Sequence, residues 1–237
     1  MIVIGDLHIG VESHLGSKGF HLPSRTAVMR DDLLEISDDA SRLVVLGDVK
    51  DSVPGSTKQE YREIPDFFQA MLERFDIVDV VTGNHDTQIE DFLPKHVNVH
   101  PASGLRIGDI GMIHGHTWPS ADVMASRTLI TAHNHPAVMF RDGVGKRTTE
   151  PCWFRAPFRG APDGYVKHPE EMIMIPAFNR LLGGYPVNVT GEKFLGPLMN
   201  SDTIDIDGAQ IFLLDGVCLG RRKNLMVSGR DRSKYEK

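Results

Sequence analysis

Aspartate, asparagine and histidine residues occur at five places in the chain, each just after a short apolar run. Carboxylate and amide oxygens together with imidazole nitrogens suit Mn²⁺, Fe²⁺ or Zn²⁺ better than Ca²⁺, which prefers oxygen ligands alone. The residue types therefore indicate a metal site with mixed nitrogen and oxygen ligands. In chain order the residues are Asp6 and His8, then Asp48, then Asn84, His85 and Asp86, then His114, and finally His133 and His135.

Each of these segments alone is a weak signal. A Gly-Asp pair after a strand is usually a turn, an Asn-His-Asp run can be an Asx turn, and a single histidine is more often structural than a ligand. Five such segments, each following an apolar strand, are much harder to explain by chance. In open α/β sheets the loops beyond the carboxyl ends of the strands converge and carry the sites.

The first half of the chain alternates predicted strands and helices. Residues Ile2–Ile4, Arg42–Leu46 and Ile77–Thr82 are apolar, β-branched runs without strict alternation, which is typical of strands covered on both faces. Between them, Ile64–Phe75 has apolar residues on one helical face, and Thr26–Ile36 shows a weaker version of the same pattern. This order predicts α/β units with a parallel sheet.

The second half predicts a second sheet packed on the first. Short β segments and turn residues dominate it, and residues 178–200 are rich in Gly and Pro and predict a long irregular connection. We expect a single catalytic domain over residues 1–220 and a basic C-terminal tail over 221–237. The expected strands are a hairpin over Leu105–Ile113, strands at Leu129–Ala132 and Ala137–Phe140, and a closing hairpin over residues 211–219 across Asp215-Gly216.

Composition narrows the class of protein. With 41% hydrophobic and 24% charged residues among 237, the chain has ordinary globular composition and is long enough for a sizeable core. No apolar run approaches the roughly 20 residues of a membrane-spanning helix. A net charge of −6 argues against a wholly basic protein that coats nucleic acid. The two cysteines cannot form a disulfide framework, and the chain begins directly with MIVIGDLH, so we expect a cytoplasmic protein.

The order D-x-H, G-D, G-N-H-D, H and H-x-H resembles the calcineurin-like metallophosphoesterase superfamily of two-metal hydrolases. Within it the chain is similar to phosphoesterases related to the SbcD-type nuclease, both the archaeal branch and the bacterial DNA ligase-associated metallophosphoesterases. The resemblance implies a four-layer α/β sandwich in which two mixed β-sheets pack face to face with flanking helices. The segments that support the narrower match are GFHLP at 19–23, LGDVK at 46–50, AHNHP at 132–136 and IPAFN at 175–179.

The resemblance also implies the roles of the site residues. Two divalent ions are expected, with Mn²⁺ favoured and Fe²⁺ or Zn²⁺ as alternatives. A hydroxide held between them would attack a phosphodiester in line, with nucleic acid as the expected substrate. His85 would assist the leaving group, and Asp86 would orient His85 through a hydrogen bond. The implied ligands are Asp6, His8 and His135 for the first ion, Asp48 as the bridge, and Asn84, His114 and His133 for the second.

Several alternatives stay open at this stage. The substrate could instead be a nucleotide or another small phosphate ester, or the fold could serve as a non-catalytic scaffold. Trp118 and Trp153 could stack on bases or pack in the core. A basic stretch could contact a phosphate backbone or be a solvated hairpin face, and comprises Arg141, Lys146, Arg147 and Arg155.

The expected partners follow from the same resemblance. We expect single-stranded DNA or RNA ends as the substrate and no membrane. A second copy of the chain and a DNA-repair protein are the candidate protein partners.

Overall fold

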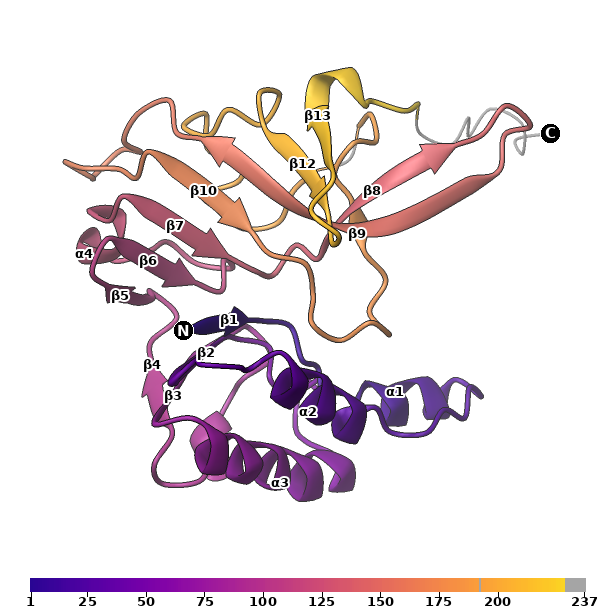
Figure 1. The fold of residues 1–237 in the computed structure, drawn as a ribbon, viewed down its shortest axis with the longest axis vertical. Coiled ribbons are helices and arrows are strands. Elements are labelled where there is room, and N and C mark those ends of the chain that lie inside the picture. Colours follow the sequence, from indigo (N-terminus) through magenta and orange to yellow (C-terminus); the bar gives the residue numbers. More distant parts are fainter. Residues whose placement is uncertain (192, 229–237) are drawn as a thin grey trace.

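The first sheet is built from four parallel strands in the order β1-β2-β3-β4 (Figure 1). The computed structural model describes residues 1–191 and 193–228. The strands run in one direction, so their carboxyl ends lie at one edge of the sheet. They are β1 (Ile2–Ile4), β2 (Arg42–Leu46), β3 (Ile77–Val81) and β4 (Asn98–His100).

Helices cover the outer face of this sheet (Figure 1). The longest, α3 (Lys58–Arg74), begins with a capping box in which Thr57 and Glu60 bond each other's backbone N–H groups. Its apolar face is buried against the sheet. The other elements of this half are α1 (Val11–Ser17), α2 (Thr26–Glu35) and the 3₁₀ turn η1 (Ile89–Asp91).

The second sheet is mixed and has nine strands. β6, β7 and β10 run parallel, whereas β9 is antiparallel to β8, β10 and β12. Its strands are β5 (Leu105–Ile107), β6 (Ile110–Ile113), β7 (Thr128–Thr131), β8 (Pro136–Arg141), β9 (Arg147–Pro157), β10 (Glu171–Met174), β11 (Tyr185–Pro186), β12 (Gln210–Leu213) and β13 (Cys218–Arg221). A short helix, α4 (Ala121–Met124), and a 3₁₀ turn, η2 (Arg222–Asn224), complete this half.

Alternate side chains along the strands pack into different apolar cores. In β2, Leu43 and Val45 point to the helices, whereas Val44 and Leu46 point to the second sheet. In β10, Ile173 points to the first sheet, and its neighbours Met172 and Met174 point to the outer face. Both sheets are thus covered on both faces, which explains their continuous apolar sequences.

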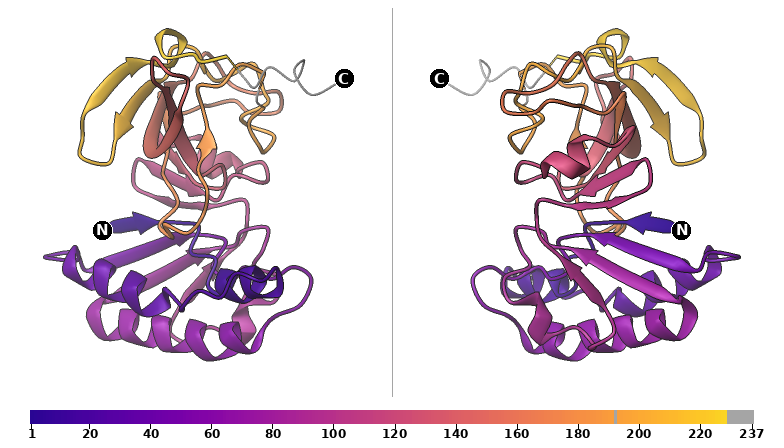
Figure 2. Two further views of the ribbon diagram at one scale, coloured as in Figure 1. Left: turned by 90° about the vertical axis from the view of Figure 1, so that its right-hand side faces the viewer. Right: turned by 90° about the vertical axis from the view of Figure 1, so that its left-hand side faces the viewer.

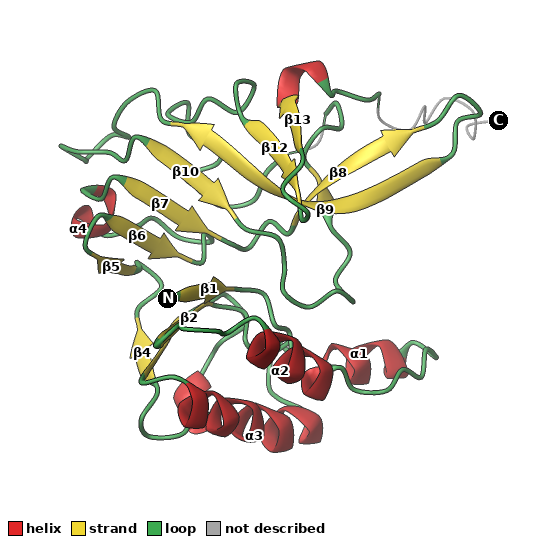
Figure 3. Ribbon diagram, in the orientation of Figure 1, coloured by secondary structure: helices red, strands yellow, loops and turns green. Residues whose placement is uncertain are grey.

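The predicted two-sheet α/β architecture is confirmed, with two differences in detail. The first sheet is entirely parallel rather than mixed. The outer face of the second sheet is covered by α4 and by irregular chain carrying Phe194, Leu198 and Met199, rather than by long helices (Figures 2 and 3). At the C-terminal end, Arg221 still belongs to β13, and residues 229–237 of the predicted basic tail lie outside the described residues.

No helix in the described part of the chain combines the length and the apolar character needed to cross a membrane.

A buried ion-pair network fixes the far edge of the first sheet. Asp79 is 1% exposed and contacts Arg42 Nε and His100 Nε2, both at 2.7 Å. Burial alone would raise the pKa of the Asp79 carboxyl, but the hydrogen bonds from Arg42 and His100 lower it below its usual value. A carboxylate whose pKa is lowered by folding stabilises the protein above its unfolded pKa of about 3.9, and this stabilisation is lost as the pH falls through the folded pKa.

We therefore expect Asp79→Asn to lower the free energy of unfolding at pH 7 by about 2 kcal/mol, the size of hydrogen bonds to a charged group. The difference from the wild type should begin to shrink below about pH 4, the pKa of the unfolded carboxyl, and should vanish only below the lower pKa of the folded protein. Urea titrations at several pH values measure this, with the exposed Asp76→Asn as the matched control. A difference that stays constant down to pH 3 would contradict the assignment.

Candidate metal centre

The implied ligands all lie in loops that follow strand ends. Asp6 and His8 follow β1, Asp48 follows β2 and Asn84 follows β3. His114 follows β6, and His133 and His135 lie between β7 and β8. β1 to β3 are parallel to one another, as are β6 and β7, and the two sets of ends open on the same side of the molecule (Figure 1).

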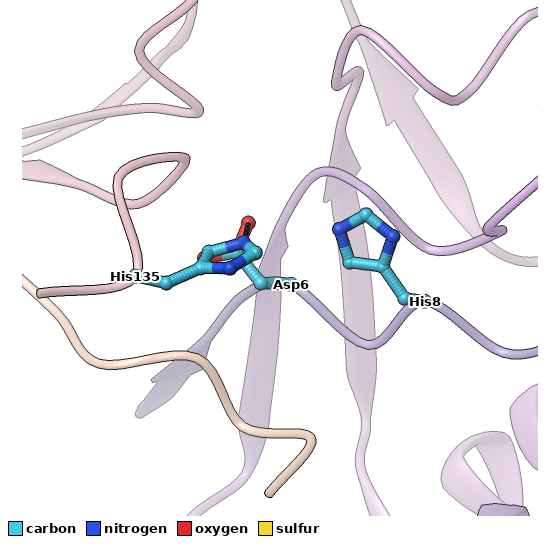
Figure 4. A group of neighbouring side chains, drawn as sticks. All are labelled: Asp6, His8 and His135. Atoms are coloured by element: carbon cyan, nitrogen blue, oxygen red, sulfur yellow. Dashed lines mark ion pairs between the residues drawn. The ribbon is translucent and has the colours of Figure 1, made fainter. Parts of the chain in front are cut away.

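One group of ligand atoms comes from Asp6, His8 and His135. Each residue offers one nitrogen or oxygen atom, and these three atoms lie within 4.8 Å of one another. His135 Nε2 is 3.3 Å from Asp6 Oδ1. In Figure 4, His135 reaches Asp6 from the loop after β7, and His8 lies further along the loop that carries Asp6. The Asp6 carboxylate also accepts the backbone N–H of His133 at 3.2 Å, which ties the β1 loop to the β7 loop.

A second group comes from Asp48, His114 and His133. His114 Nε2 lies 3.1 Å from His133 Nδ1 and 3.1 Å from Asn84 Oδ1. His114 Nδ1 faces the Leu46 carbonyl oxygen at 2.7 Å, which places a proton on Nδ1 and leaves Nε2 with its lone pair directed at the other ligands.

Asp48 joins the two groups. Its Oδ2 is 3.4 Å from His8 Nε2 and 3.3 Å from His114 Nε2, so one carboxylate faces ligands on both sides. Its Oδ1 accepts the backbone N–H of His85 at 2.9 Å. This central position is the one expected of a bridging ligand. We call the set Asp6, His8, Asp48, Asn84, His114, His133 and His135 the ligand cluster.

The backbone of the ligand cluster is strained. Of the seven non-glycine residues with positive φ in the described part of the chain, five belong to it. Such a conformation raises the free energy of the folded state by about 1–3 kcal/mol per residue. Residues in this conformation are concentrated at sites where function requires a particular side-chain direction. The five residues are Asp6 (57°), His8 (40°), Asp48 (50°), His133 (69°) and His135 (45°).

Two glycines allow the loops after β2 and β3 to meet. A Cβ atom on Gly83 would lie 2.2 Å from the Asp48 backbone nitrogen, and one on Gly47 would lie 2.8 Å from His114 Nδ1. Any side chain at Gly83 therefore displaces Asp48.

We expect Gly83→Ala to weaken metal binding and to lower any hydrolytic kcat/KM by about 10²-fold, the usual cost of misplacing a catalytic group by about 1 Å. Metal titration and steady-state kinetics measure both effects. The control is Gly160→Ala, where no atom lies within 4 Å of the added methyl group. Equal activity of the two variants would contradict the close approach.

The ligand cluster strongly favours positive charge. Burial would lower the pKa of His8, but hydrogen bonds and charge from Asp48 and Asp51 raise it to about 10. Burial likewise opposes protonation of His114, and Asp48 raises its pKa to about 9. The pKa of Asp48 is lowered, against burial, by the same two histidines. Burial and the charge of His114 lower the pKa of His133 to about 4. Carboxylates that hold protons on buried imidazoles this firmly are equally suited to hold cations.

The ligand cluster fits divalent metal ions. His8 Nε2 and His135 Nε2 are buried and make no hydrogen bond with the described residues, although both face carboxylate oxygens. Two atoms that share an ion at about 2.1 Å lie no more than about 4.2 Å apart. The distances from His135 to Asp6, from His8 and His114 to Asp48, and from His114 to Asn84 and His133 are 3.1–3.4 Å and satisfy this limit. Nitrogen and oxygen donors together suit transition metals such as Mn²⁺, Fe²⁺ or Zn²⁺.

His85 lies beside the ligand cluster, but Asp86 does not orient it as predicted. His85 Nδ1 faces the Asp51 carbonyl oxygen at 2.6 Å, which leaves Nε2 for the cluster side. The Asp86 carboxylate is 1% exposed and accepts backbone N–H groups of Val49 and Gly83, both at 2.8 Å. The predicted Asp86–His85 hydrogen bond is therefore wrong, because Asp86 points into the protein and clamps the β2 and β3 loops together. Burial raises the pKa of this carboxyl.

The sequence did not single out Asp51 as a site residue. Its carboxylate contacts His8 Nδ1 at 3.0 Å, and its carbonyl oxygen faces His85. Asp51 thus directs Nε2 of both histidines toward the ligand cluster. Its proximity to Asp48 in LGDVKD was the available signal. His116 also lies close, with its ring 5.3 Å from that of His114, outside the groups of ligand atoms.

A cleft of about 330 Å³ opens over the ligand cluster. Besides members of the cluster, it is lined by His85, Asn134, Gly184, Tyr185 and Leu195. Within the described part of the chain, the predicted substrate contacts do not line it. Arg141 and Arg147 stand at the far end of the β8–β9 hairpin, where both contact Ser228, and Lys146 is in the turn between these strands. Arg155 pairs with Glu171 on β10. Arg141, Lys146 and Arg147 lie away from the cleft because β8 runs away from His135.

Comparison with known proteins identifies the fold. No family model matches the chain, and no curated protein matches its sequence. The crystal structure of the nuclease MPE of Pseudomonas putida matches with a TM-score of 0.53 and 17% identity, over 89% of this chain and 81% of that chain. The phosphoesterase Yfce from E. coli matches with a TM-score of 0.42, 13% identity and coverages of 92% and 96%. A metallophosphoesterase from Sphaerobacter thermophilus matches with a TM-score of 0.35, 14% identity and coverages of 90% and 83%.

The first of these matches establishes the fold. The chain shares its two-sheet fold with that nuclease structure, as its sequence motifs predict, and the motif residues lie in the loops after the strand ends.

Proposed function

We propose that this protein is a two-metal phosphoesterase that hydrolyses a phosphodiester, with nucleic acid as the substrate. The observation that carries the proposal is the position of Asp48 between two groups of nitrogen and oxygen ligands. Two divalent ions, with Mn²⁺ favoured, would supply Lewis acidity, charge neutralisation and an activated water to this reaction.

The residues of the chain have distinct roles in this proposal. Asp6, His8 and His135 would hold one ion, Asn84, His114 and His133 would hold the other, and Asp48 would be shared between them. Asp51 and Leu46 accept hydrogen bonds from the distal ring nitrogens of His8 and His114 and so fix which nitrogen faces the site.

His85 acts on the substrate rather than on the ions. Its Nδ1–H donates to the Asp51 carbonyl oxygen, and protonated Nε2 donates to an oxygen of the phosphate or to the leaving oxygen. His85 lines the cleft, which supports a contact between its side chain and a phosphate bound there.

The nucleic-acid part of the proposal is supported by the fold likeness to a nuclease. In this proposal the substrate is the end of a single-stranded DNA or RNA. The protein binds it alone, as a dimer, or together with a DNA-repair protein. The second candidate is a hydrolase of nucleotides or other small phosphate esters. The net charge of −6 and the position of the predicted basic residues away from the cleft favour this second candidate.

Hydrolysis by metal-stripped protein distinguishes these candidates. Mn²⁺, Zn²⁺ or Mg²⁺ is restored, and bis-p-nitrophenyl phosphate, p-nitrophenyl phosphate and labelled single-stranded DNA are offered in parallel. Mn²⁺-dependent cleavage of the diester and the DNA supports the proposal. Cleavage of the monoester alone moves the assignment to a small-molecule phosphatase.

A further inference from the structure

A second, larger cavity adjoins the metal cleft. It encloses about 680 Å³, within the range of roughly 300–1,000 Å³ usual for small-molecule sites. His135 and Gly184 line both the cavity and the cleft, so the two lie next to each other. We call this second cavity the apolar groove.

The walls of the apolar groove come from both halves of the fold. β1 and the segment after β10 form one side, because the Phe178 backbone N–H donates to the Gly5 carbonyl oxygen at 3.0 Å. β9 and Leu214 at the tip of the β12–β13 hairpin form the other side. Figure 2 shows this hairpin reaching from the second sheet toward β1 and α2.

Trp153 is the aromatic residue placed to stack on a ligand in the apolar groove. Its neighbours on β9, Cys152 and Phe154, are buried in the core of the second sheet. Since side chains alternate along a strand, the Trp153 indole is on the opposite face, where it lines the groove and is 37% exposed. Exposed indole faces stack on flat, uncharged rings.

The charged residues of the apolar groove select against a second phosphate. Its lining contains two negatively charged carboxylates, those of Asp32 and Glu150, and one positively charged guanidinium, that of Arg180. Carboxylates repel phosphate, but they accept hydrogen bonds from the N–H groups of a nucleobase. A ligand here is therefore flat and uncharged and carries at least one N–H donor.

We propose that the apolar groove binds a nucleobase of the substrate, stacked on Trp153, while the adjoining phosphate lies at the ligand cluster. This inference rests on the proposed function and adds the substrate class, a nucleoside phosphodiester. Stacking of a base on an aromatic residue is worth about 1–3 kcal/mol, or about 5- to 150-fold in binding.

The first test measures binding without any metal or turnover. The chain has two tryptophans, so in Trp118→Phe the fluorescence comes from Trp153 alone. Trp118 lies outside the groove lining, with its ring near Tyr165. Thymidine should quench the emission of Trp118→Phe, whereas deoxyribose should not. The reverse variant, Trp153→Phe, should show no specific quenching by thymidine. Equal quenching in both variants, or none in Trp118→Phe, overturns the proposal.

The second test measures cleavage of thymidylyl-thymidine and of the same diester with both bases replaced by hydrogen. We expect wild type and Trp118→Ala to prefer the natural diester by about 5- to 150-fold in kcat/KM. Trp153→Ala should lose most of this preference and cleave the base-free diester as the wild type does, and Trp153→Phe should retain part of it. Equal cleavage of the two diesters by the wild type overturns the groove assignment but leaves the phosphodiesterase intact. Quenching by thymidine without cleavage of either diester keeps the base site and overturns the proposed function.

Discussion

Asp48→Asn should abolish the metal centre. Asparagine keeps the shape of the side chain, but it lacks the charge and one of the two oxygens, of which Oδ2 faces His8 and His114 and Oδ1 accepts the His85 backbone N–H. We expect the number of tightly bound Mn²⁺ ions to fall from two per chain to at most one. We expect kcat/KM for a diester to fall by more than about 10³-fold, since metal catalysis is worth several kcal/mol of transition-state stabilisation.

Metal analysis after gel filtration and steady-state kinetics measure both effects of Asp48→Asn. The matched control is Asp38→Asn, which makes the same chemical change at another aspartate with positive φ, in the segment between α2 and β2. The control should bind metal and turn over as the wild type does. Two tightly bound ions in Asp48→Asn would refute the bridging role.

His85→Ala should separate metal binding from turnover. The side chain reaches the cleft from the β3 loop and has the Asp51 carbonyl oxygen as its partner. Its removal therefore leaves the ligand cluster in place. We expect both ions to be retained and kcat to fall by about 10²- to 10⁴-fold, the usual contribution of a general acid.

The same metal analysis and kinetics apply to His85→Ala, with the exposed His96→Ala as the control. One of the groups of neighbouring ligand atoms contains His85 together with His8 and Asp48, so the alternative role is that of a ligand. Loss of one ion in His85→Ala would establish that alternative and overturn the role in acid–base catalysis.

The elements that carry the ligand cluster were predictable because their signals are local. β1 and β2 were expected within their observed bounds, and α3 was expected from its apolar face, although it begins earlier, at Lys58. The capping box at Thr57 explains that start and is itself visible in the sequence. Four strands in the described part of the chain were not predicted: β4, β9, β10 and β11. β4, β10 and β11 are short, and β10 (EMIM) has few β-branched residues. β9 is long, but its sequence, RTTEPCWFRAP, contains two prolines, which weaken the strand signal.

The contacts within the site were less predictable because they depend on loops that are distant in sequence. Asp51 meets His8 only because the β1 and β2 loops run side by side, through the hydrogen bonds of His8 and Ile9 to the Asp48 and Val49 carbonyl oxygens. Asp86 faces the loop backbone because backbone N–H groups of Val49 and Gly83, from two different loops, converge on its carboxylate.

The basic residues show that closeness in sequence need not give closeness in space. Arg141 follows His135 by one strand, and six residues of β8 at about 3.3 Å each place it about 20 Å away. A contact between these basic residues and substrate would therefore lie outside the cleft, and it stays a prediction.

The most direct test of the account is a titration of metal-stripped protein with Mn²⁺, in which hydrolysis of bis-p-nitrophenyl phosphate is recorded against bound metal. The account predicts that activity rises with Mn²⁺ and saturates at two ions per chain, and that Asp48→Asn shows no such rise. A protein that binds no Mn²⁺, or binds two ions and hydrolyses no phosphate ester, would contradict it.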